Sequence, residues 1–323
     1  MKKIAVLTSG GDSPGMNAAI RSVVRTCVSK NISILGILEG FNGLVKGEFI
    51  ELGPRDVSNI LQRGGTILRS ARSKEFRTSQ GRELAYKNLK QEQIDGLIVI
   101  GGDGSFTGAS VFHQEYRVPF IGIPGTIDND LFGTDFTLGF DTACNTIVEA
   151  VDKIKDTAAS HNRLFFVEVM GRDSGYIGLT TGIATGAEEI LLPETATNID
   201  QLIAKLEDSQ KSRKNSSIVI VAEGDDGGGA YSIAQKVKEK FTHYDTRVTV
   251  LGHLQRGGRP SCLDRVLGSQ FGHKAVESLV SGKSNVMVGI LNGEIAETSI
   301  ELAISNTKPL KQHLFHIKDD LTL

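Results

Sequence analysis

Short apolar segments of strand length recur along the chain and alternate with segments that have a helical hydrophobic period. Many of the short segments are continuous in apolar residues, a pattern typical of parallel strands that are covered on both faces. The segments that predict strands are 4–7, 34–38, 97–100, 120–123, 164–169, 218–222, 248–251 and 286–291.

Helical patterns separate these strands, and in one of them, 141–158, the apolar residues form a one-sided stripe. The alternation of strands and helices predicts βαβ units and an α/β fold with mostly parallel sheets. The strands outnumber those of one small sheet, so we expect two Rossmann-like lobes with the active site in the cleft between them. The predicted helices are 16–28, 141–158, 199–206, 231–241 and 267–280, with another beginning at Phe106.

Composition places the chain among ordinary folded proteins. It has 323 residues, 39% hydrophobic and 23% charged, with a formal net charge of −2. This balance argues against a disordered chain and against a general nucleic-acid binder. The cysteines Cys27, Cys144 and Cys262 are widely spaced, which indicates free thiols in a reducing compartment. No stretch approaches the ~20 apolar residues of a membrane helix, so we expect a cytoplasmic protein without a membrane partner.

The 37 glycines, about 11% of the chain against a typical ~7%, gather in short polar loops that directly follow the predicted strands. Ligands of parallel α/β sheets bind outside the carboxyl ends of the strands. Loops at these positions therefore predict one shared binding cleft. The loops are 8–15, 101–105, 124–130, 170–172, 223–224 and 252–258.

Two of these loops have the features of a phosphate site. Loop 10–15 precedes the helix at Met16, and loop 101–105 precedes the helix at Phe106. Glycine lets a ligand approach the backbone, and the amides at a helix N-terminus favour anions. Neither loop is a Walker A motif or a GxGxxG fingerprint. The alternative reading of either loop by itself is a tight turn between a strand and a helix.

Acidic and basic residues in these loops point to phosphoryl transfer. Among the aspartates Asp103, Asp128 and Asp130, one carboxylate can hold Mg²⁺ and another can take a proton from a hydroxyl. Their alternative role is turn formation. Arg172, directly after a strand, can stabilise charge on a transferring group. Further candidate phosphate ligands, each of which can instead be a surface ion-pair residue, are Arg72, Arg163, Arg247, His253 and Arg256.

At these residues the sequence closely resembles the bacterial ATP-dependent 6-phosphofructokinase family. The match begins at Lys3 and runs nearly to the C-terminus. The motifs that carry it are TSGGDSPGMNAAIR (8–21), GGDGS (101–105), PGTIDND (124–130), EVMGR (168–172) and GHLQRGG (252–258).

The resemblance implies transfer of the γ-phosphate of ATP to the 1-hydroxyl of fructose 6-phosphate. It makes Asp128 the general base, Asp103 and Asp130 the Mg²⁺ ligands, and Thr126, Arg172 and Gly11 stabilisers of the transferring group. The implied ATP-binding residues are Gly11, Arg72, Ser73, Gly102, Asp103, Gly104 and Ser105. The implied sugar-phosphate residues are Thr126, Asp128, Arg163, Met170, Gly171, Arg172, Glu223, Arg247, His253 and Arg256.

Arg163 and Arg247 match family arginines that reach across from a neighbouring subunit, so the resemblance implies a homo-oligomer, usually a tetramer. It also implies a division of the chain into two lobes. The nucleotide lobe would comprise 1–139 and 253–304, and the sugar-phosphate lobe 140–252 and 305–323.

Two glycines favour ATP as the phosphoryl donor. Pyrophosphate-using relatives place Asp where Gly104 stands and Lys where Gly125 stands. An Asp at position 104 would repel the α-phosphate of ATP. The alternatives are a pyrophosphate-dependent enzyme and a noncatalytic nucleotide or sugar-phosphate sensor. A nicotinamide oxidoreductase is disfavoured because no GxGxxG follows any strand.

The resemblance also implies an effector pocket at a subunit interface, for ADP as activator or phosphoenolpyruvate as inhibitor. This sequence departs from the family pattern there, since Lys155 replaces an arginine and Arg55 lies one place beyond an expected arginine. A lysine supplies a point charge without the arginine fork, so we expect altered or weakened regulation. The candidate effector residues are Arg21, Arg25, Arg55, Lys155, Gly186, Glu188, Lys211 and Lys214.

Overall fold

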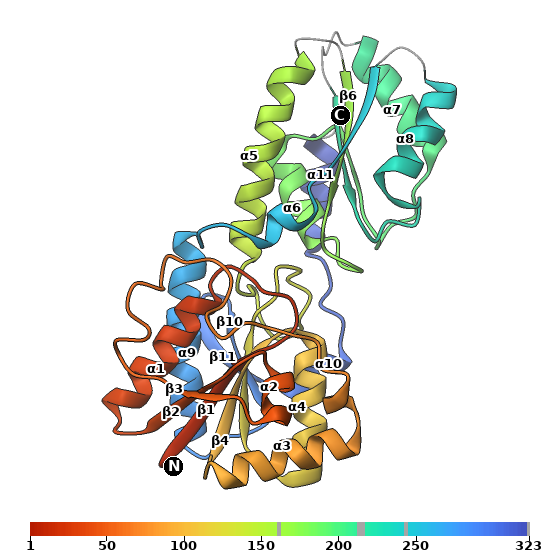
Figure 1. Cartoon of the computed structure of the whole chain (residues 1–323). Helices are drawn as coiled ribbons and strands as arrows, with labels where there is room; N and C mark the ends of the chain where they lie inside the picture. Colours follow the sequence, from red (N-terminus) through yellow and green to blue (C-terminus); the bar gives the residue numbers. More distant parts are fainter. Residues whose placement is uncertain (160–162, 212–216, 242–244, 322–323) are drawn as a thin grey trace. The chain divides into compact units, whose positions relative to one another are not determined.

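The computed structural model describes residues 1–159, 163–211, 217–241 and 245–321 and divides the chain into two compact units (Figure 1). In the described part of the chain, no helix combines the length and the apolar character that crossing a membrane requires. The chain passes between the units more than once. The first unit comprises Met1–Ile127, Leu131–Thr142 and Arg256–Lys308, and the second comprises Asp128–Asp130, Ala143–Gln255 and Pro309–Leu323.

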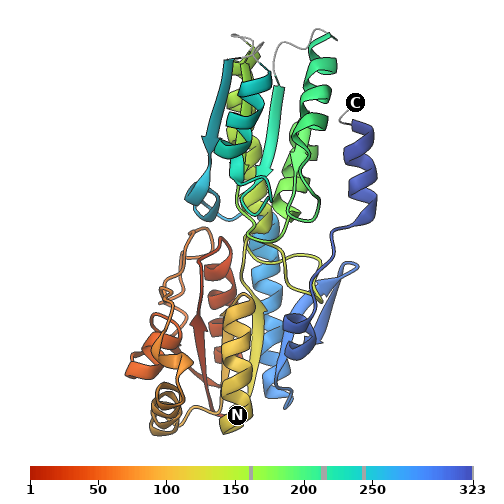
Figure 2. The ribbon, with the colours of Figure 1, turned by 90° about the vertical axis from the view of Figure 1, so that its right-hand side faces the viewer.

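The first unit is built on a seven-stranded sheet of order β11-β10-β5-β4-β1-β2-β3. The five inner strands run parallel, while the edge strands β3 and β11 are antiparallel to their neighbours. The β10–β11 hairpin is the pair of blue arrows in Figure 2. The strands are β1 Lys3–Thr8, β2 Ser33–Ile37, β3 Phe49–Glu51, β4 Gly96–Gly101, β5 Phe120–Pro124, β10 Val286–Leu291 and β11 Glu294–Ser299.

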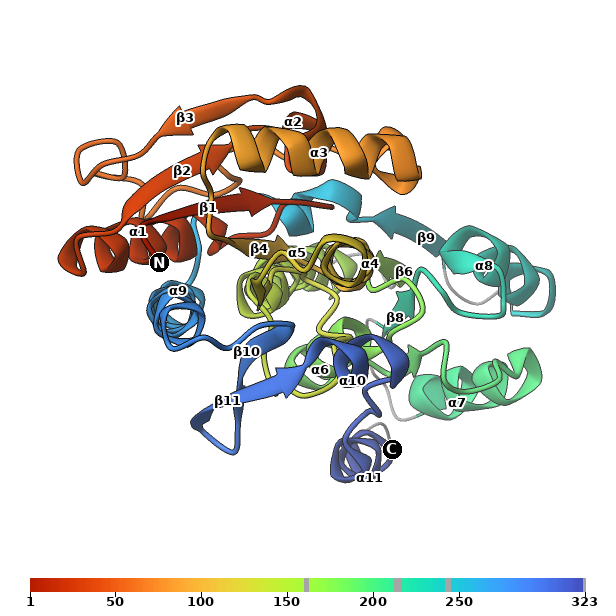
Figure 3. The ribbon, with the colours of Figure 1, turned by 90° about the horizontal axis from the view of Figure 1, so that it is seen from below.

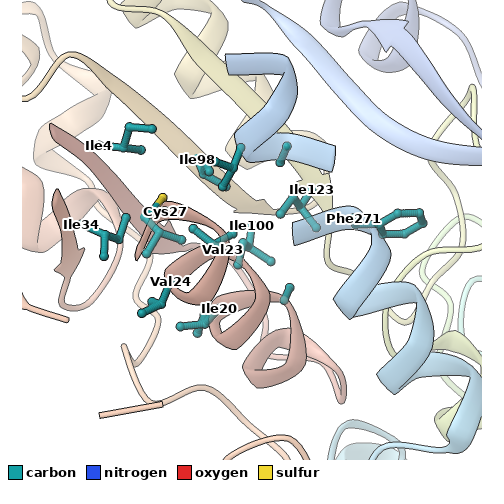
Figure 4. Close-up of a cluster of buried hydrophobic side chains, with 14 of the residues drawn as sticks. Ile4, Ile20, Val23, Val24, Cys27, Ile34, Ile98, Ile100, Ile123 and Phe271 are labelled. Atoms are coloured by element: carbon teal, nitrogen blue, oxygen red, sulfur yellow. The ribbon is translucent and has the colours of Figure 1, made fainter. Parts of the chain in front are cut away.

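Helices cover both faces of this sheet, which explains the continuous apolar strands. In β1, Ile4 and Val6 pack in one buried cluster with α1 and α9, whereas Ala5 and Leu7 pack in the opposite cluster. Figure 3 shows α1 and α3 on opposite sides of β1, and Figure 4 shows part of the cluster around Val23. The covering helices are α1 Met16–Ser29, α2 Phe41–Lys46, α3 Ser79–Gln91, α4 Asp103–Tyr116, α9 Cys262–Val280 and α10 Ile300–Ser305.

The second unit contains a parallel four-stranded sheet of order β7-β8-β6-β9. Helices α7 and α8 bury their apolar residues against one face of this sheet, and α5 and α6 lie on the other side of β6 (Figure 1). The strands are β6 Arg163–Val169, β7 Glu189–Leu191, β8 Ser217–Ala222 and β9 Asp245–Val250. The helices are α5 Phe140–Ala159, α6 Tyr176–Thr185, α7 Ile199–Lys211, α8 Gly229–Lys240 and α11 Gln312–Leu321.

The predicted α/β class with mostly parallel sheets is confirmed, and each predicted strand and helix is present. The strand expected at 248–251 lies earlier, as Asp245–Val250, and the helix expected from residue 267 begins at Cys262. Among the described residues, three strands and five helices were not predicted. They are β3, β7, β11, α2, α3, α6, α10 and α11.

Candidate active site

In the first unit, three polar loops follow the adjacent parallel strands β1, β4 and β5 and therefore lie along one edge of the sheet. Backbone hydrogen bonds join the loops to one another. Ser9 N donates to Ile100 O at 2.9 Å, and Gly125 N donates to Gly101 O at 2.9 Å. The two loops predicted as phosphate sites, 10–15 and 101–105, thus lie at this edge together with the start of the loop after β5.

The guanidinium of Arg256 lies against the backbone of Gly11. A Cβ built on Gly11 would be 2.5 Å from Nη1 of Arg256, so no larger residue fits without displacing that arginine. Arg256 Nη1 also donates to Asp12 O at 3.3 Å. Arg256 thus places a positive charge beside the backbone of the loop after β1, a combination that suits a phosphate group.

The loop after β4 leads directly into α4, with Gly102 as its N-cap and Asp103 as its first residue. Asp103 is exposed, whereas Ser105 is buried with Oγ 3.5 Å from the position a Cβ on Gly10 would take. A Cβ on Gly102 would lie 3.5 Å from Cβ of Thr126, which follows β5. Gly11, Gly102 to Ser105 and Thr126 therefore occupy neighbouring loops of one sheet edge.

Arg72 and Ser73 precede the short 3₁₀ helix Glu75–Arg77 in the first unit. Arg72 is exposed, and Ser73 Oγ accepts a hydrogen bond from Phe76 N at 3.1 Å. This bond fixes the backbone just after Arg72.

In the second unit, Arg172 and Asp128 form an ion pair with Nε 3.5 Å from Oδ2. The Asp128 side chain is 2% exposed, and that of Arg172 is 54% exposed. Arg172 N donates to Glu223 Oε1 at 2.9 Å, which joins the loop after β6 to the loop after β8. A side chain on Gly224 would collide with Arg172 O, so this close approach requires glycine. The structure brings three predicted residues together here.

Gln255 was not singled out from the sequence, and it supports a loop that carries candidate site residues. It is fully buried, its Oε1 accepts from Met170 N at 3.0 Å, and its Nε2 donates to Gly252 O at 3.1 Å. Gln255 therefore anchors the loop that carries Met170 and Gly171 to the short helix Gly252–Arg256, on which His253 is exposed. The GHLQRGG motif contains Gln255 and could have pointed to this residue.

Arg163 and Arg247 lie away from the loop that carries Arg172. Arg163 is the first residue of β6, whereas Arg172 follows the end of that strand, and the register pairs Arg163 with Asp245 at the start of β9. Asp245 Oδ2 is 3.2 Å from Arg163 Nε and 2.7 Å from Arg247 Nη2. Arg163 is thus at the opposite end of β6 from Arg172, and Arg247 lies in the amino-terminal half of β9.

The effector candidates lie in both units. In the first, Arg21 and Arg25 are one turn apart on α1, and Arg55 is exposed after β3. In the second, Lys155 Nζ donates to Thr185 O and lies near Gly186.

Glu188 directly precedes β7, and its Oε2 accepts a hydrogen bond from Ser209 Oγ at 2.9 Å. Lys211 is the last residue of α7, and Lys214 lies outside the described residues.

No group of three or more His, Cys, Asp or Glu side chains in the described ranges is arranged to hold a metal ion. Mg²⁺ in phosphoryl-transfer sites is usually held by one or two carboxylates together with substrate phosphates and water. The exposed Asp103 carboxylate, at the N-terminus of α4, fits that mode of binding.

Comparisons with known proteins agree with this chemistry. The chain is 54% identical over 323 residues to "ATP-dependent 6-phosphofructokinase 2" of Bacteroides thetaiotaomicron, covering 100% of this chain and 99% of the relative. It is 51% identical to "ATP-dependent 6-phosphofructokinase 1" of Thermus thermophilus, covering 100% of both chains.

Among solved structures, phosphofructokinase from Saccharomyces cerevisiae superposes with a TM-score of 0.91 at 38% identity, covering 100% of this chain and 48% of the yeast chain. The family model described as "Phosphofructokinase" matches residues 3–279. The full-length identity and this match show that the chain belongs to the phosphofructokinase family.

Proposed function

We propose that this chain transfers the γ-phosphoryl group of ATP to the 1-hydroxyl of fructose 6-phosphate, giving fructose 1,6-bisphosphate and ADP. Membership of the family and the names of the relatives support this reaction. The single observation that carries the mechanism is the buried Asp128 carboxylate beside the exposed guanidinium of Arg172.

Asp128 is proposed as the general base. Its carboxylate takes the proton of the 1-hydroxyl as that oxygen attacks the γ-phosphorus, and the bond from phosphorus to the β,γ-bridging oxygen breaks. Arg172, 3.5 Å from Asp128, can reach the oxygens of the transferring group. Gly11 N and Thr126 contribute further hydrogen bonds to that group. Such catalysis is mostly positioning and charge stabilisation.

ATP is proposed to bind along the loops of the first unit. The backbone amides of Gly102 to Ser105 at the start of α4 would contact phosphate oxygens, and Arg72 and Ser73 would line the remainder of the site. Asp103 and Asp130 would hold Mg²⁺, which neutralises phosphate charge when bound.

The sugar phosphate is proposed to bind to the loops of the second unit. Glu223, already held by Arg172 N, can accept a sugar hydroxyl. Met170 and Gly171 would contact the sugar ring. His253 and Arg256 would bind its phosphate group.

Arg163 and Arg247 are proposed to serve the site of a neighbouring subunit. Their position at the amino end of β6 and β9 makes a role in their own chain's site difficult. We therefore infer a homo-oligomer, with a tetramer as the expected form, acting in the cytoplasm.

Regulation by ADP or phosphoenolpyruvate is proposed for the set that includes Arg21, Arg25, Arg55, Lys155 and Glu188. Lys155 already donates to Thr185 O, so an anionic effector would compete with that bond. The test is the rate at subsaturating fructose 6-phosphate with millimolar effector. An unchanged rate would remove the regulatory proposal and leave the catalytic one intact.

One coupled assay tests the catalytic proposal. Initial rates are measured with ATP and fructose 6-phosphate, with pyrophosphate in place of ATP, and with other hexose phosphates in place of the acceptor. We expect turnover with ATP and fructose 6-phosphate far above the other pairs. Turnover with pyrophosphate alone would establish the pyrophosphate-dependent alternative, and binding of both substrates without turnover would establish a sensor.

A further inference from the structure

Asp264, on the first turn of α9, is a fully buried carboxylate outside the set of predicted site residues. It accepts hydrogen bonds from Gly139 N at 2.7 Å, from Thr142 N at 2.9 Å and from Thr142 Oγ1 at 2.5 Å. Burying a carboxylate costs free energy, which three hydrogen bonds only partly offset. Each of its two oxygens accepts from a different backbone N–H, which an asparagine side chain with one acceptor oxygen cannot reproduce.

Asp264 holds the segment 137–139 through Gly139 N, and the two preceding residues of this segment form hydrogen bonds with the backbone at the end of β5 and just after it. Thr137 Oγ1 donates to Thr126 O at 2.6 Å, and Leu138 N donates to Pro124 O at 2.8 Å. The next residue, Gly139, is the one whose N donates to Asp264. Consecutive residues of one short segment thus connect the buried carboxylate to the backbone on both sides of Gly125.

We infer that Asp264 is a positioning residue for phosphoryl transfer. It fixes 137–139 from α9, and 137–139 in turn fixes Thr126 and the start of the loop that leads to Asp128. A small misplacement of reacting groups has a large effect on rate, so rigid support of this loop matters more for turnover than for ground-state binding. This inference rests on the proposed function of Thr126 and Asp128.

The competing explanation is that Asp264 only stabilises the N-terminus of α5, where Thr142 lies. Two variants separate these roles. Asp264→Asn keeps the shape but replaces one acceptor atom with a donor, so one backbone N–H loses its partner. Ser261→Ala is the matched control, because it removes the cap bond to Asp264 N at 3.2 Å and leaves the acceptor bonds of the carboxylate in place.

We expect Asp264→Asn to lower kcat by roughly 10-fold to 100-fold, with the KM of each substrate changed less than about threefold. Ser261→Ala should lower Tm while kcat stays within about twofold. A kcat of Asp264→Asn within twofold of the wild type, measured well below its Tm, would overturn the inference.

If Asp264→Asn does not fold, the variants Thr137→Val and Thr137→Ser test the positioning role instead. Valine removes the hydroxyl that donates to Thr126 O, and serine restores it. We expect a loss of kcat with valine and recovery with serine. Equal rates for both variants and the wild type would refute the positioning role.

A readout that does not need activity separates this inference from the proposed function. Hydrogen exchange of the amides at 125–127 should be faster in Asp264→Asn, or in Thr137→Val, than in Ser261→Ala. Unchanged exchange would overturn the inference. A wild-type chain inactive with ATP and fructose 6-phosphate would instead contradict the proposed function, and the exchange measurement would still decide on the role of Asp264.

Discussion

The Nε atom of Arg172 lies 3.5 Å from Oδ2 of Asp128. This ion pair combines a buried carboxylate of the candidate site with an exposed guanidinium. The backbone of Arg172 is itself fixed by Glu223. A base must face its substrate while remaining protected from water, and a charge stabiliser must reach the same group. The burial of Asp128 and the exposure of Arg172 are what the proposed roles of base and charge stabiliser require.

Asp128→Asn should lower kcat by roughly 10²-fold or more, because the amide cannot accept the proton of the attacking hydroxyl. Binding of fructose 6-phosphate should be largely retained. Steady-state kinetics and calorimetric titration with the sugar phosphate measure the two quantities. Asp173→Asn, which neutralises an exposed carboxylate next to Arg172, is the control and should stay near wild-type turnover. Near-normal turnover of Asp128→Asn would remove Asp128 from the role of base.

Gly104→Asp should raise the KM for ATP more than Gly104→Asn does. A Cβ on Gly104 meets no atom within 4 Å, so the fold accommodates both side chains. The two side chains are nearly the same size, and the difference between the variants therefore reports charge repulsion of the triphosphate. Initial rates over a range of ATP concentrations, repeated at two ionic strengths, measure it. Equal KM values for the two variants would contradict a phosphate site beside Gly104.

Gly104→Asp by itself should not produce efficient use of pyrophosphate. The second position that distinguishes the donors, Gly125, is packed tightly, since a Cβ there would lie 3.0 Å from both Ile100 Cγ2 and Met16 Cε. A lysine at position 125 requires movement of these core residues. Efficient turnover of the Gly104→Asp variant with pyrophosphate would show that this packing does not control donor choice.

Gln255→Met should raise the KM for fructose 6-phosphate by about tenfold and leave the KM for ATP nearly unchanged. The substitution removes the acceptor for Met170 N and the donor to Gly252 O while keeping a similar volume. The loop with Met170 and Gly171 then loses its anchor. Equal changes in both KM values, or no change in either, would contradict a specific role in the sugar-phosphate site.

The ion pairs of Glu189 in the second unit imply that the stability of the fold depends on pH. Burial raises the pKa of its carboxyl. The hydrogen bond from Lys205, the charge of Lys318 and the N–H of Ile190 together lower the pKa by more than burial raises it, so it lies below the usual 4.5. Its oxygens lie 2.6 Å from Lys205 Nζ and 3.1 Å from Lys318 Nζ. A depressed pKa in the folded state contributes stability above the unfolded-state pKa, and that stability is lost as pH falls through the folded-state pKa.

Glu189→Gln should therefore lower the free energy of unfolding at pH 7 by roughly 1–3 kcal/mol and flatten its decline below pH ~4.5. Urea unfolding between pH 7 and pH 3.5 measures both effects. Glu149→Gln is the control, because Glu149 pairs with Lys153 on α5 but is exposed, and it should change the curve little. A Glu189→Gln curve parallel to that of the wild type would contradict this account.

The strands that could be predicted were those long enough to show a continuous apolar run. The short strand β7 begins with Glu189, which looks like a surface residue until Lys205 and Lys318 are seen beside it. Helix α6 contains Gly178 and Gly182, poor helix formers in sequence terms. Both are closely packed, since a Cβ on Gly178 would lie 3.0 Å from Leu192 Cδ2 and one on Gly182 would lie still closer to Ile190 Cδ1.

The sequence singled out candidate site residues where a polar side chain stands in the loop after a strand, as with Asp103, Asp128 and Arg172. Gln255 and Asp264 instead accept hydrogen bonds from the backbone of other loops, and the partners of Asp264 lie more than 120 residues away in sequence. In the sequence, an aspartate three residues after a serine is typical of the start of a helix. Asp264 does lie at such a start, since its N donates to the N-cap Ser261 Oγ. Its hydrogen bonds with Gly139 and Thr142 become visible only in the fold.

The most direct test of the whole account is a crystal structure with fructose 6-phosphate, Mg²⁺ and a non-hydrolysable ATP analogue bound together. We expect a carboxylate oxygen of Asp128 about 2.6–3.2 Å from the 1-hydroxyl oxygen, in line with the γ-phosphate, and Asp103 beside the metal ion. Asp128 beyond hydrogen-bond reach of the sugar, with both ligands fully occupied, would contradict the mechanism.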